Sequence, residues 1–278
     1  MSVRVLKIIA VASAFAGVVS TAAALAQRGG ADDAQPRAVT EARAPGRPLV
    51  VIDAGHGGKD PGAYSQATGI YEKDVNLAVS RAIRDQLVRS GRVRVAMTRD
   101  DDVFVPLPGR VALARRLGAD LFVAVHADSA PNVNAHGATI YTLSEVASDG
   151  EAARLAAREN SRAGTRDIVL PTRDPGVRAI LADLTQRETM TNSADFAGLL
   201  QREAAGRGVP FRQKYHRFAN FVVLKAADTA AVLLESGYLT NDGDARFLIS
   251  PEGRARIATG MARAIETHFA REKAESER

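Results

Sequence analysis

Short apolar runs alternate with amphipathic segments along most of the chain. Leu49–Ile52 and Leu121–Val125 are continuous apolar runs, the pattern of strands that are buried on both faces. Between them, apolar residues recur at helical spacing from Val75 to Leu87, and Gly91 marks the end of that predicted helix. The alternation predicts an open α/β sheet, in which functional sites lie beyond the carboxyl ends of the strands.

The same patterns predict further elements toward the C-terminal end. Strands are expected over residues 92–98, 138–143, 221–224 and 231–234, and helices after Pro106 and over residues 244–249 and 251–269. Residues 145–217 differ, because they are charged and helical with little strand signal. We interpret them as a helical insertion between two strands, and a loop system of that size is more often functional than idle.

The two ends of the chain have a different character. Arg4 and Lys7 precede an apolar run that closes with small residues at Ala26, so residues 1–26 are predicted to be a cleaved secretory signal peptide. Residues 27–47 are predicted to be a flexible linker, residues 48–270 the folded domain, and residues 271–278 a charged tail. No second hydrophobic span follows, so we expect a periplasmic protein without a permanent membrane anchor.

Composition narrows the possible chemistry. The 278 residues contain no cysteine, which excludes disulfides, thiol nucleophiles and cysteinyl metal sites, so any metal must be held by histidine and carboxylates. The formal net charge of +5 is a mild excess. No basic motif with interleaved aromatic residues is present, so nucleic acid is not an expected partner.

Four side chains with catalytic potential stand at the ends of predicted elements. His56 follows the first strand in a glycine-rich loop, Glu72 begins the first helix, His126 ends a second strand and Glu235 ends a third. Two imidazoles and one carboxylate are the usual protein ligands of a catalytic zinc ion, and a further carboxylate can accept a proton. The alternative is two structural histidines and two ordinary acids, and spacing alone leaves both open.

Seven stretches of the chain, in order, resemble the type-3 N-acetylmuramoyl-L-alanine amidases of bacterial cell walls. They are Val51–Ala63 (VIDAGHGGKDPGA), Glu72–Leu77, Thr98-Arg99, Leu107–Ala114, Val125–Asp128, Phe221–Lys225 and Leu234–Asn241 (LESGYLTN). The resemblance implies a single α/β domain with a mostly parallel sheet of about six strands. It also implies that His56, Glu72 and His126 bind Zn²⁺ and that Glu235 is the catalytic carboxylate.

The implied reaction is hydrolysis of the amide between the lactyl group of N-acetylmuramic acid and L-alanine in peptidoglycan. Such a reaction serves wall remodelling and the separation of daughter cells. The alternatives are a zinc carboxypeptidase or deacylase acting on another envelope substrate, and an inactive wall-binding regulator. The last of these requires a broken ligand set, whereas all four residues are present.

The insertion resembles that of the cell-division amidases, in which a helical segment blocks the active site until a LytM-type activator removes it. A carboxylate from this segment could occupy the open position on the metal. Glu151 is the predicted candidate, because it begins the first inserted helix, and Glu145 and Glu159 rank behind it.

Overall fold

The computed structural model describes residues 39–41, 46–162, 177–225 and 229–278. The predicted signal peptide, residues 1–26, lies outside these ranges, as does most of the predicted linker. Within the described ranges, no helix combines the length and the apolar character needed to cross a bilayer.

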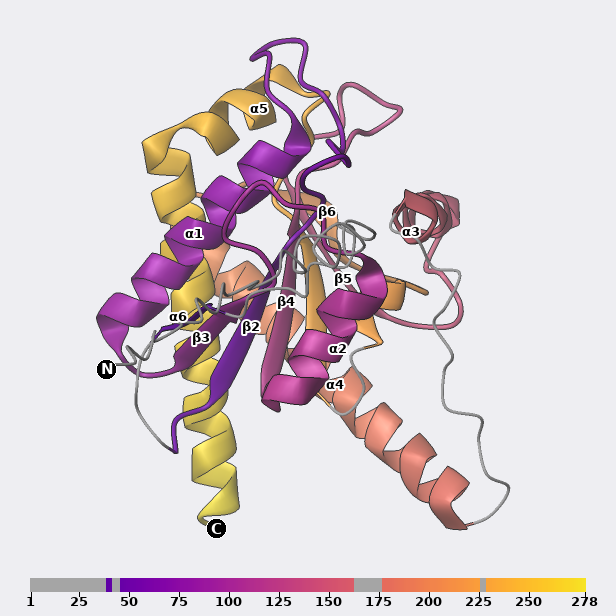
Figure 1. Cartoon of the computed structure of the whole chain (residues 1–278), viewed down its shortest axis with the longest axis vertical. Coiled ribbons are helices and arrows are strands. Elements are labelled where there is room, and N and C mark those ends of the chain that lie inside the picture. The colour runs from indigo at the N-terminus through magenta and orange to yellow at the C-terminus, as the bar shows by residue number, and fades with distance from the viewer. Residues whose placement is uncertain (1–38, 42–45, 163–176, 226–228) are drawn as a thin grey trace, which may run out of the picture. The chain divides into compact units, whose positions relative to one another are not determined.

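A mixed sheet forms the centre of the domain (Figure 1). Its order is β1-β3-β2-β4-β7-β5-β6. The strands are β1 (Val39–Glu41), β2 (Leu49–Ala54), β3 (Arg94–Met97), β4 (Leu121–His126), β5 (Ala138–Leu143), β6 (Phe211–Ala219) and β7 (Ala230–Glu235). Strands β3, β2, β4 and β7 are mutually parallel, β5 is antiparallel to β7, and β6 is parallel to β5. The predicted α/β class and mostly parallel sheet are confirmed, and the short β1 adds an antiparallel edge strand.

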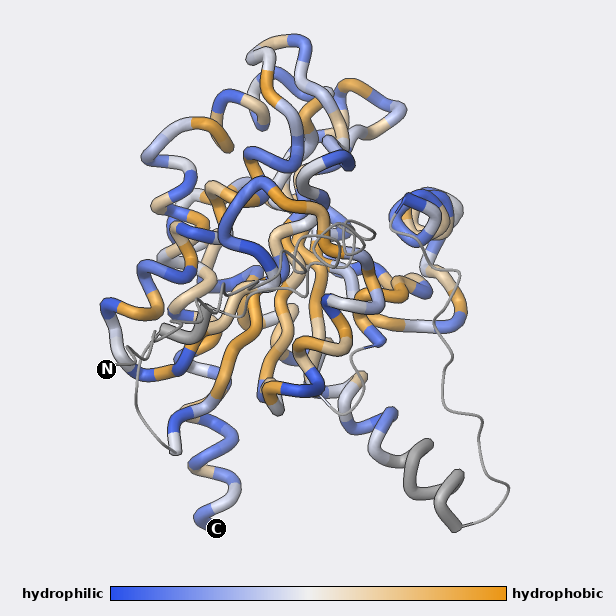
Figure 2. The backbone as a smooth tube through the Cα atoms, in the orientation of Figure 1, coloured by the Kyte–Doolittle hydropathy of each residue, from blue (hydrophilic) through white to orange (hydrophobic). Residues whose placement is uncertain are grey.

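Helices cover both faces of this sheet. They are α1 (Glu72–Ser90), α2 (Leu107–Leu117), α3 (Gly150–Arg162), α4 (Val177–Ala205), α5 (Asp242–Ile249) and α6 (Pro251–Ser276), with a short 3₁₀ helix, η2 (Val222–Leu224). Val50 and Ile52 of β2 pack in the same apolar cluster as residues of α1, α4 and α6, whereas Leu49 and Val51 pack with residues of α2 and α3. Figure 2 shows the apolar strands between helices of mixed polarity.

Two predicted elements near the insertion were wrong. Residues 222–224 form the 3₁₀ helix η2 and not a strand, although Phe221, just before it, and Leu224 are buried in the core as an apolar run predicts. Residues 211–217, assigned to the helical insertion, belong to strand β6 at the sheet edge. Gln213 and Lys214 in the middle of this strand are exposed, so it lacks the apolar run that marks the central strands.

The C-terminal end also differs from the expected charged tail. Helix α6 continues through residues 271–276, beyond the predicted helical limit at Phe269. Its inner face carries the predicted apolar residues Ile257, Met261 and Ile265, all of which are buried.

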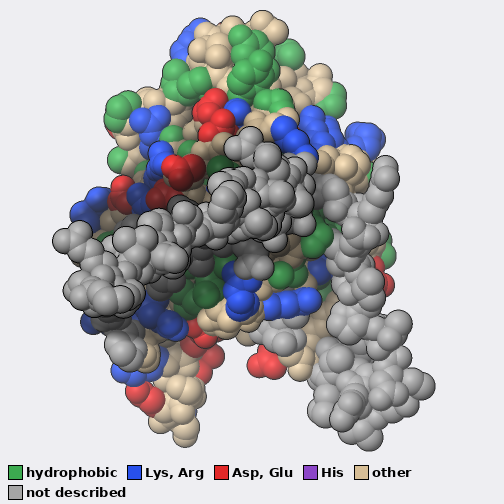
Figure 3. All heavy atoms as spheres, viewed as in Figure 1, with side chains coloured by type: hydrophobic (Ala, Val, Ile, Leu, Met, Phe, Trp, Pro, Cys, Tyr) green, Lys and Arg blue, Asp and Glu red, His purple; other side chains and the backbone are tan. Residues whose placement is uncertain are grey.

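On the face of the molecule shown in Figure 3, basic and acidic side chains are interspersed.

Candidate metal centre

The His56 loop begins where β2 ends. The residue itself has a left-handed backbone, with φ of 60°, and its side chain is buried. Nδ1 of His56 is 2.8 Å from Oδ2 of Asp60, so this carboxylate fixes the ring and leaves Nε2 facing the interior of the site. Burial alone would lower the pKa of His56, but the negative charges of Glu72, Asp60 and Glu159 outweigh it and raise that pKa well above its usual value.

Glu72 is the first residue of α1, and its carboxylate points between the two histidines. Its Oε2 accepts a hydrogen bond of 2.9 Å from the backbone N–H of Ala63, and its Oε1 accepts one of 3.1 Å from the N–H of Ala127. Burial opposes ionisation, but His56 and His126 hold the pKa of Glu72 well below its usual value. The two neighbouring imidazoles therefore favour the ionised form of this fully buried carboxylate.

His126 and Glu235 lie on neighbouring strands. They are register partners at the carboxyl ends of the parallel strands β4 and β7, so their side chains leave the sheet together. Oε2 of Glu235 accepts a hydrogen bond of 3.0 Å from the N–H of Asp128, and its buried Oε1 has no hydrogen-bond partner in the described residues. Burial, together with the charges of Asp128 and Glu72, raises the pKa of Glu235 well above its usual value.

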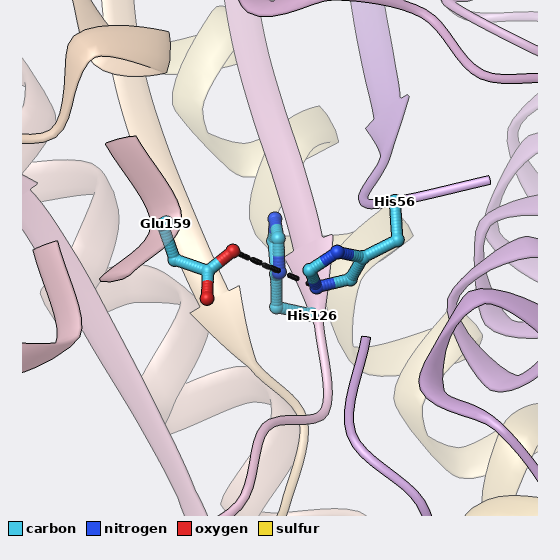
Figure 4. Close-up of side chains that lie close together, drawn as sticks. All are labelled: His56, His126 and Glu159. Carbon is cyan, nitrogen blue, oxygen red and sulfur yellow. Dashed lines mark ion pairs between the residues drawn. The ribbon is translucent and has the colours of Figure 1, made fainter. Parts of the chain in front are cut away.

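The ligand atoms of four residues converge at this edge of the sheet. Oε1 of Glu72 lies 3.0 Å from Nε2 of His56 and 3.2 Å from Nδ1 of His126. Oε2 of Glu159, on α3, lies 3.5 Å from the same nitrogen of His56 and 3.8 Å from that of His126. Figure 4 shows Glu159 directed at both rings.

This geometry fits a divalent cation. Bonds of about 2.1 Å to a tetrahedral ion hold the ligand atoms about 3.4 Å apart, close to the observed separations. Nε2 of His56 is buried and has no hydrogen-bond partner among the described residues, although a carboxylate oxygen is only 3.0 Å away. A ring nitrogen and a carboxylate oxygen that face each other at this distance can both become ligands of one metal ion.

The carboxylate of α3 that lies at the histidines is not that of Glu151, the residue expected to block the site. The carboxylate of Glu151 is bound by Arg212 and Arg217 of β6, and the structure does not bring it to the histidines. Glu159 lies there instead. Eight residues of helix span about 12 Å, so one end of α3 can lie over β6 while the other reaches the His56 loop.

Two buried arginines, for which the sequence predicted no role, support the His56 loop. Arg110 donates to Oδ1 of Asp53 at 2.7 Å and to the carbonyl oxygen of His56 at 2.8 Å. Arg99 donates to the carbonyl oxygens of Ala54 and Gly55 at 2.9 and 2.8 Å. Both arginines lie in stretches that carry the family resemblance, Thr98-Arg99 and Leu107–Ala114, and this position was the feature of the sequence that could have indicated their role.

A second contact holds α3 against the site. Arg158 forms an ion pair with Asp128, two residues after His126. Burial and the charges of Glu72 and Glu159 raise the pKa of Asp128 to about 6, although Arg158 opposes that rise. With α3 in this position, the cavity beside the histidines measures about 20 Å³, room for about one water molecule.

Two histidines and a carboxylate lie at the carboxyl edge of an α/β sheet with a second carboxylate beside them, a set of side chains that could hold a metal ion and that occurs in metal-dependent hydrolases. The comparison with known families is consistent with this class. The family described as N-acetylmuramoyl-L-alanine amidase matches residues 50–267, and the chain belongs to that family.

Individual relatives agree with the family. The chain is similar to the amidase AmiC of Neisseria meningitidis serogroup B, with 35% identity over 80% of this chain and 53% of the relative, so it spans about half of that protein. It is 34% identical to the amidase AmiA of Escherichia coli K12, over 81% of this chain and 77% of the relative. Among solved structures, it resembles the catalytic domain of the amidase CwlV from Bacillus (Paenibacillus) polymyxa, with a TM-score of 0.60 and 28% identity over 80% of this chain and 98% of that one.

Proposed function

We propose that the protein is a zinc-dependent N-acetylmuramoyl-L-alanine amidase that cleaves the bond between the lactyl group and L-alanine in peptidoglycan. One observation carries the proposal: side chains from the β2 loop, α1 and β4 converge within metal-binding distance, next to the unpartnered carboxylate oxygen of Glu235. Membership of the amidase family over residues 50–267 supports the same substrate.

His56, Glu72 and His126 would hold the metal through Nε2, Oε1 and Nδ1. This donor set has no thiolate and suits Zn²⁺, which would lower the pKa of its water toward neutrality and polarise the scissile carbonyl. Asp60 keeps the proton of His56 on Nδ1, so Nε2 remains available as a ligand.

Glu235 is suited to move the proton in this reaction. Asp128 fixes one of its oxygens, while the other has no partner in the described residues and can accept the proton of the attacking water. Its raised pKa helps it retain that proton until it is passed to the departing L-alanine nitrogen. The amide is then cleaved without a covalent intermediate on the enzyme.

The conformation described here represents an inhibited enzyme in our proposal. Glu159 lies against both histidines, so its carboxylate takes the space that a water or a substrate carbonyl would need there. Helix α3 must therefore move before turnover, and a LytM-type protein is the proposed agent that withdraws it. We further propose export to the periplasm and a role in cell separation.

Metal analysis, combined with a dye-release assay on purified cell wall, tests the proposed function. We expect one zinc per chain, turnover that a chelator abolishes, and an L-alanine amino terminus in the products. Glu235→Gln should lower turnover about 10²- to 10⁴-fold, because it removes the proton acceptor, and should retain the metal. Release of a carboxyl-terminal amino acid instead would contradict the amidase assignment and indicate a carboxypeptidase.

A further inference from the structure

Glu151 is held by two arginines of the same strand, β6. Arg212 contacts both of its carboxylate oxygens, through Nη1 at 2.5 Å and Nη2 at 3.3 Å. Arg217 donates to Oε2 of Glu151 at 2.8 Å from a position that is only 5% exposed. Arg212 also donates to the hydroxyl oxygen of Tyr238 at 3.1 Å. The two guanidinium groups thus form a receptor for one carboxylate.

The acidic groups in this receptor come from α3 or the residue before it. Among the described residues, Arg212 forms an ion pair with Glu151, and Arg217 forms ion pairs with Glu151 and Asp149. The arginines themselves belong to a strand of the sheet. When α3 leaves, two guanidinium groups remain side by side on that strand without these counter-ions, and such a pair attracts a carboxylate strongly. The open enzyme therefore favours a new anion at the same place.

The receptor is connected to the catalytic edge of the sheet. The hydroxyl of Tyr238 lies 3.1 Å from that of Thr139, and Thr139 is the register partner of Glu235. A cavity of about 70 Å³ lies beneath α3 between these regions, with Asp128 and Tyr238 in its lining. Helix α3 thus sets one carboxylate at the histidines and another, eight residues earlier, at the arginines.

We propose that Arg212 and Arg217 bind a carboxylate of the peptidoglycan stem peptide, and that Glu151 occupies this subsite in the closed enzyme. The proposal rests on the amidase function proposed above. Eight helical residues correspond to about 12 Å. An extended peptide covers that distance in about three to four residues, so the subsite suits a carboxylate near the third residue of the stem. The paired arginine forks match carboxylate geometry and favour the acidic peptide over the uncharged glycan.

The background for the test is the double variant Glu151→Ala/Glu159→Ala, which removes both carboxylates of α3. Its substrates are a soluble muramoyl tripeptide with free carboxylates and the same compound with those carboxylates amidated. Adding Arg212→Gln or Arg217→Gln should raise KM for the free acid about tenfold or more, with kcat retained. The amidated compound should show no such change. Lys214→Gln, an exposed basic residue on the same strand, is the matched control.

Binding of the two tripeptides to the metal-loaded double variant, measured by calorimetry, separates this proposal from the amidase proposal. Arginine-dependent binding of the free acid without turnover would retain the subsite and overturn the amidase. If the enzyme turns over both tripeptides without preferring the free acid, or does not bind the free acid, the proposed carboxylate subsite is wrong. Arg212→Lys and Arg217→Lys retain the charge and should restore part of the affinity, which distinguishes lost binding from lost folding.

If the arginines serve only to anchor α3, the double variant gives a different result. Arg212→Gln would then leave the ratio of KM values for the two tripeptides unchanged. That result overturns the proposal.

Discussion

Nδ1 of His56 is hydrogen-bonded to Oδ2 of Asp60 at 2.8 Å, and this bond determines which nitrogen of the ring faces Glu72. A carboxylate that holds the far side of a metal-binding imidazole fixes the tautomer and makes the ring a stronger ligand. Asp60 also accepts the backbone N–H of Gly62 at 3.2 Å, so it stabilises the loop as well as the ring.

Asp60→Ala should weaken zinc affinity about 10- to 100-fold while the fold is retained. The measurement is competition for zinc with a chromogenic chelator, alongside thermal unfolding of the metal-free protein. Asp101→Ala removes a carboxylate that is largely exposed and should leave the affinity unchanged. Equal zinc affinity in the Asp60 variant and the unchanged protein would show that this hydrogen bond has no role in metal binding.

Glu159→Ala should raise turnover in the absence of an activator by about tenfold or more, equivalent to at least ~1.4 kcal/mol. Oε2 of Glu159 lies 3.5 and 3.8 Å from the two histidine nitrogens, and in the proposed mechanism it would occupy the place of the water needed for hydrolysis. Dye release from purified wall measures the effect, and Glu188→Ala, on the exposed part of α4, is the control. Unchanged low activity would remove Glu159 from the inhibitory model.

The convergence of the site could be predicted because the sequence marks the ends of buried strands clearly. His126 and Glu235 each follow a continuous apolar run, and such runs form β4 and β7, whose last residues are register partners. Glu72 could be placed because a helical period begins directly after it. Each of these signals is local in sequence, and the parallel sheet brings the carboxyl ends of the strands together.

Features that depend on tertiary packing could not be predicted in the same way. Strand β6 carries Arg212, Lys214 and Arg217, so its sequence lacks the apolar run of a central strand. The run from Phe221 to Leu224 encodes burial, which a 3₁₀ turn satisfies as well as a strand does. The choice between Glu151 and Glu159 depends on the direction in which α3 crosses the sheet edge, and that direction is not a property of the helix sequence.

Arg110→Met should destabilise the fold by about 3–5 kcal/mol, because it leaves Asp53 buried without its cation. The two side chains form an ion pair of 2.7 Å and are 3% and 1% exposed. Arg110 also donates to the carbonyl oxygen of His56, so the folded fraction of Arg110→Met should bind zinc more weakly than the unchanged protein.

Denaturant unfolding measures the stability of this variant, and a zinc titration of the folded fraction measures the second effect. Arg116→Met lies on the exposed side of the same helix and should change the free energy of unfolding by less than about 0.5 kcal/mol. Equal stability of the two variants would contradict the role given to the Asp53 pair.

Gly55→Ala should weaken zinc binding although it removes no ligand atom. A Cβ at residue 55 would lie 2.4 Å from both Cε1 and Nε2 of His126, closer than any non-bonded contact allows. The ring must therefore turn or shift, and either movement takes its Nδ1 away from Oε1 of Glu72. We expect at least about a tenfold loss of zinc affinity, with a corresponding loss of turnover at limiting metal. Gly198→Ala is the matched control: its Cβ would enter open space within α4, and replacing a helical glycine should stabilise the fold by about 0.5–1 kcal/mol.

Full zinc affinity in Gly55→Ala would mean that the His126 ring can move without leaving the cluster, and the metal geometry inferred from its position would then be wrong.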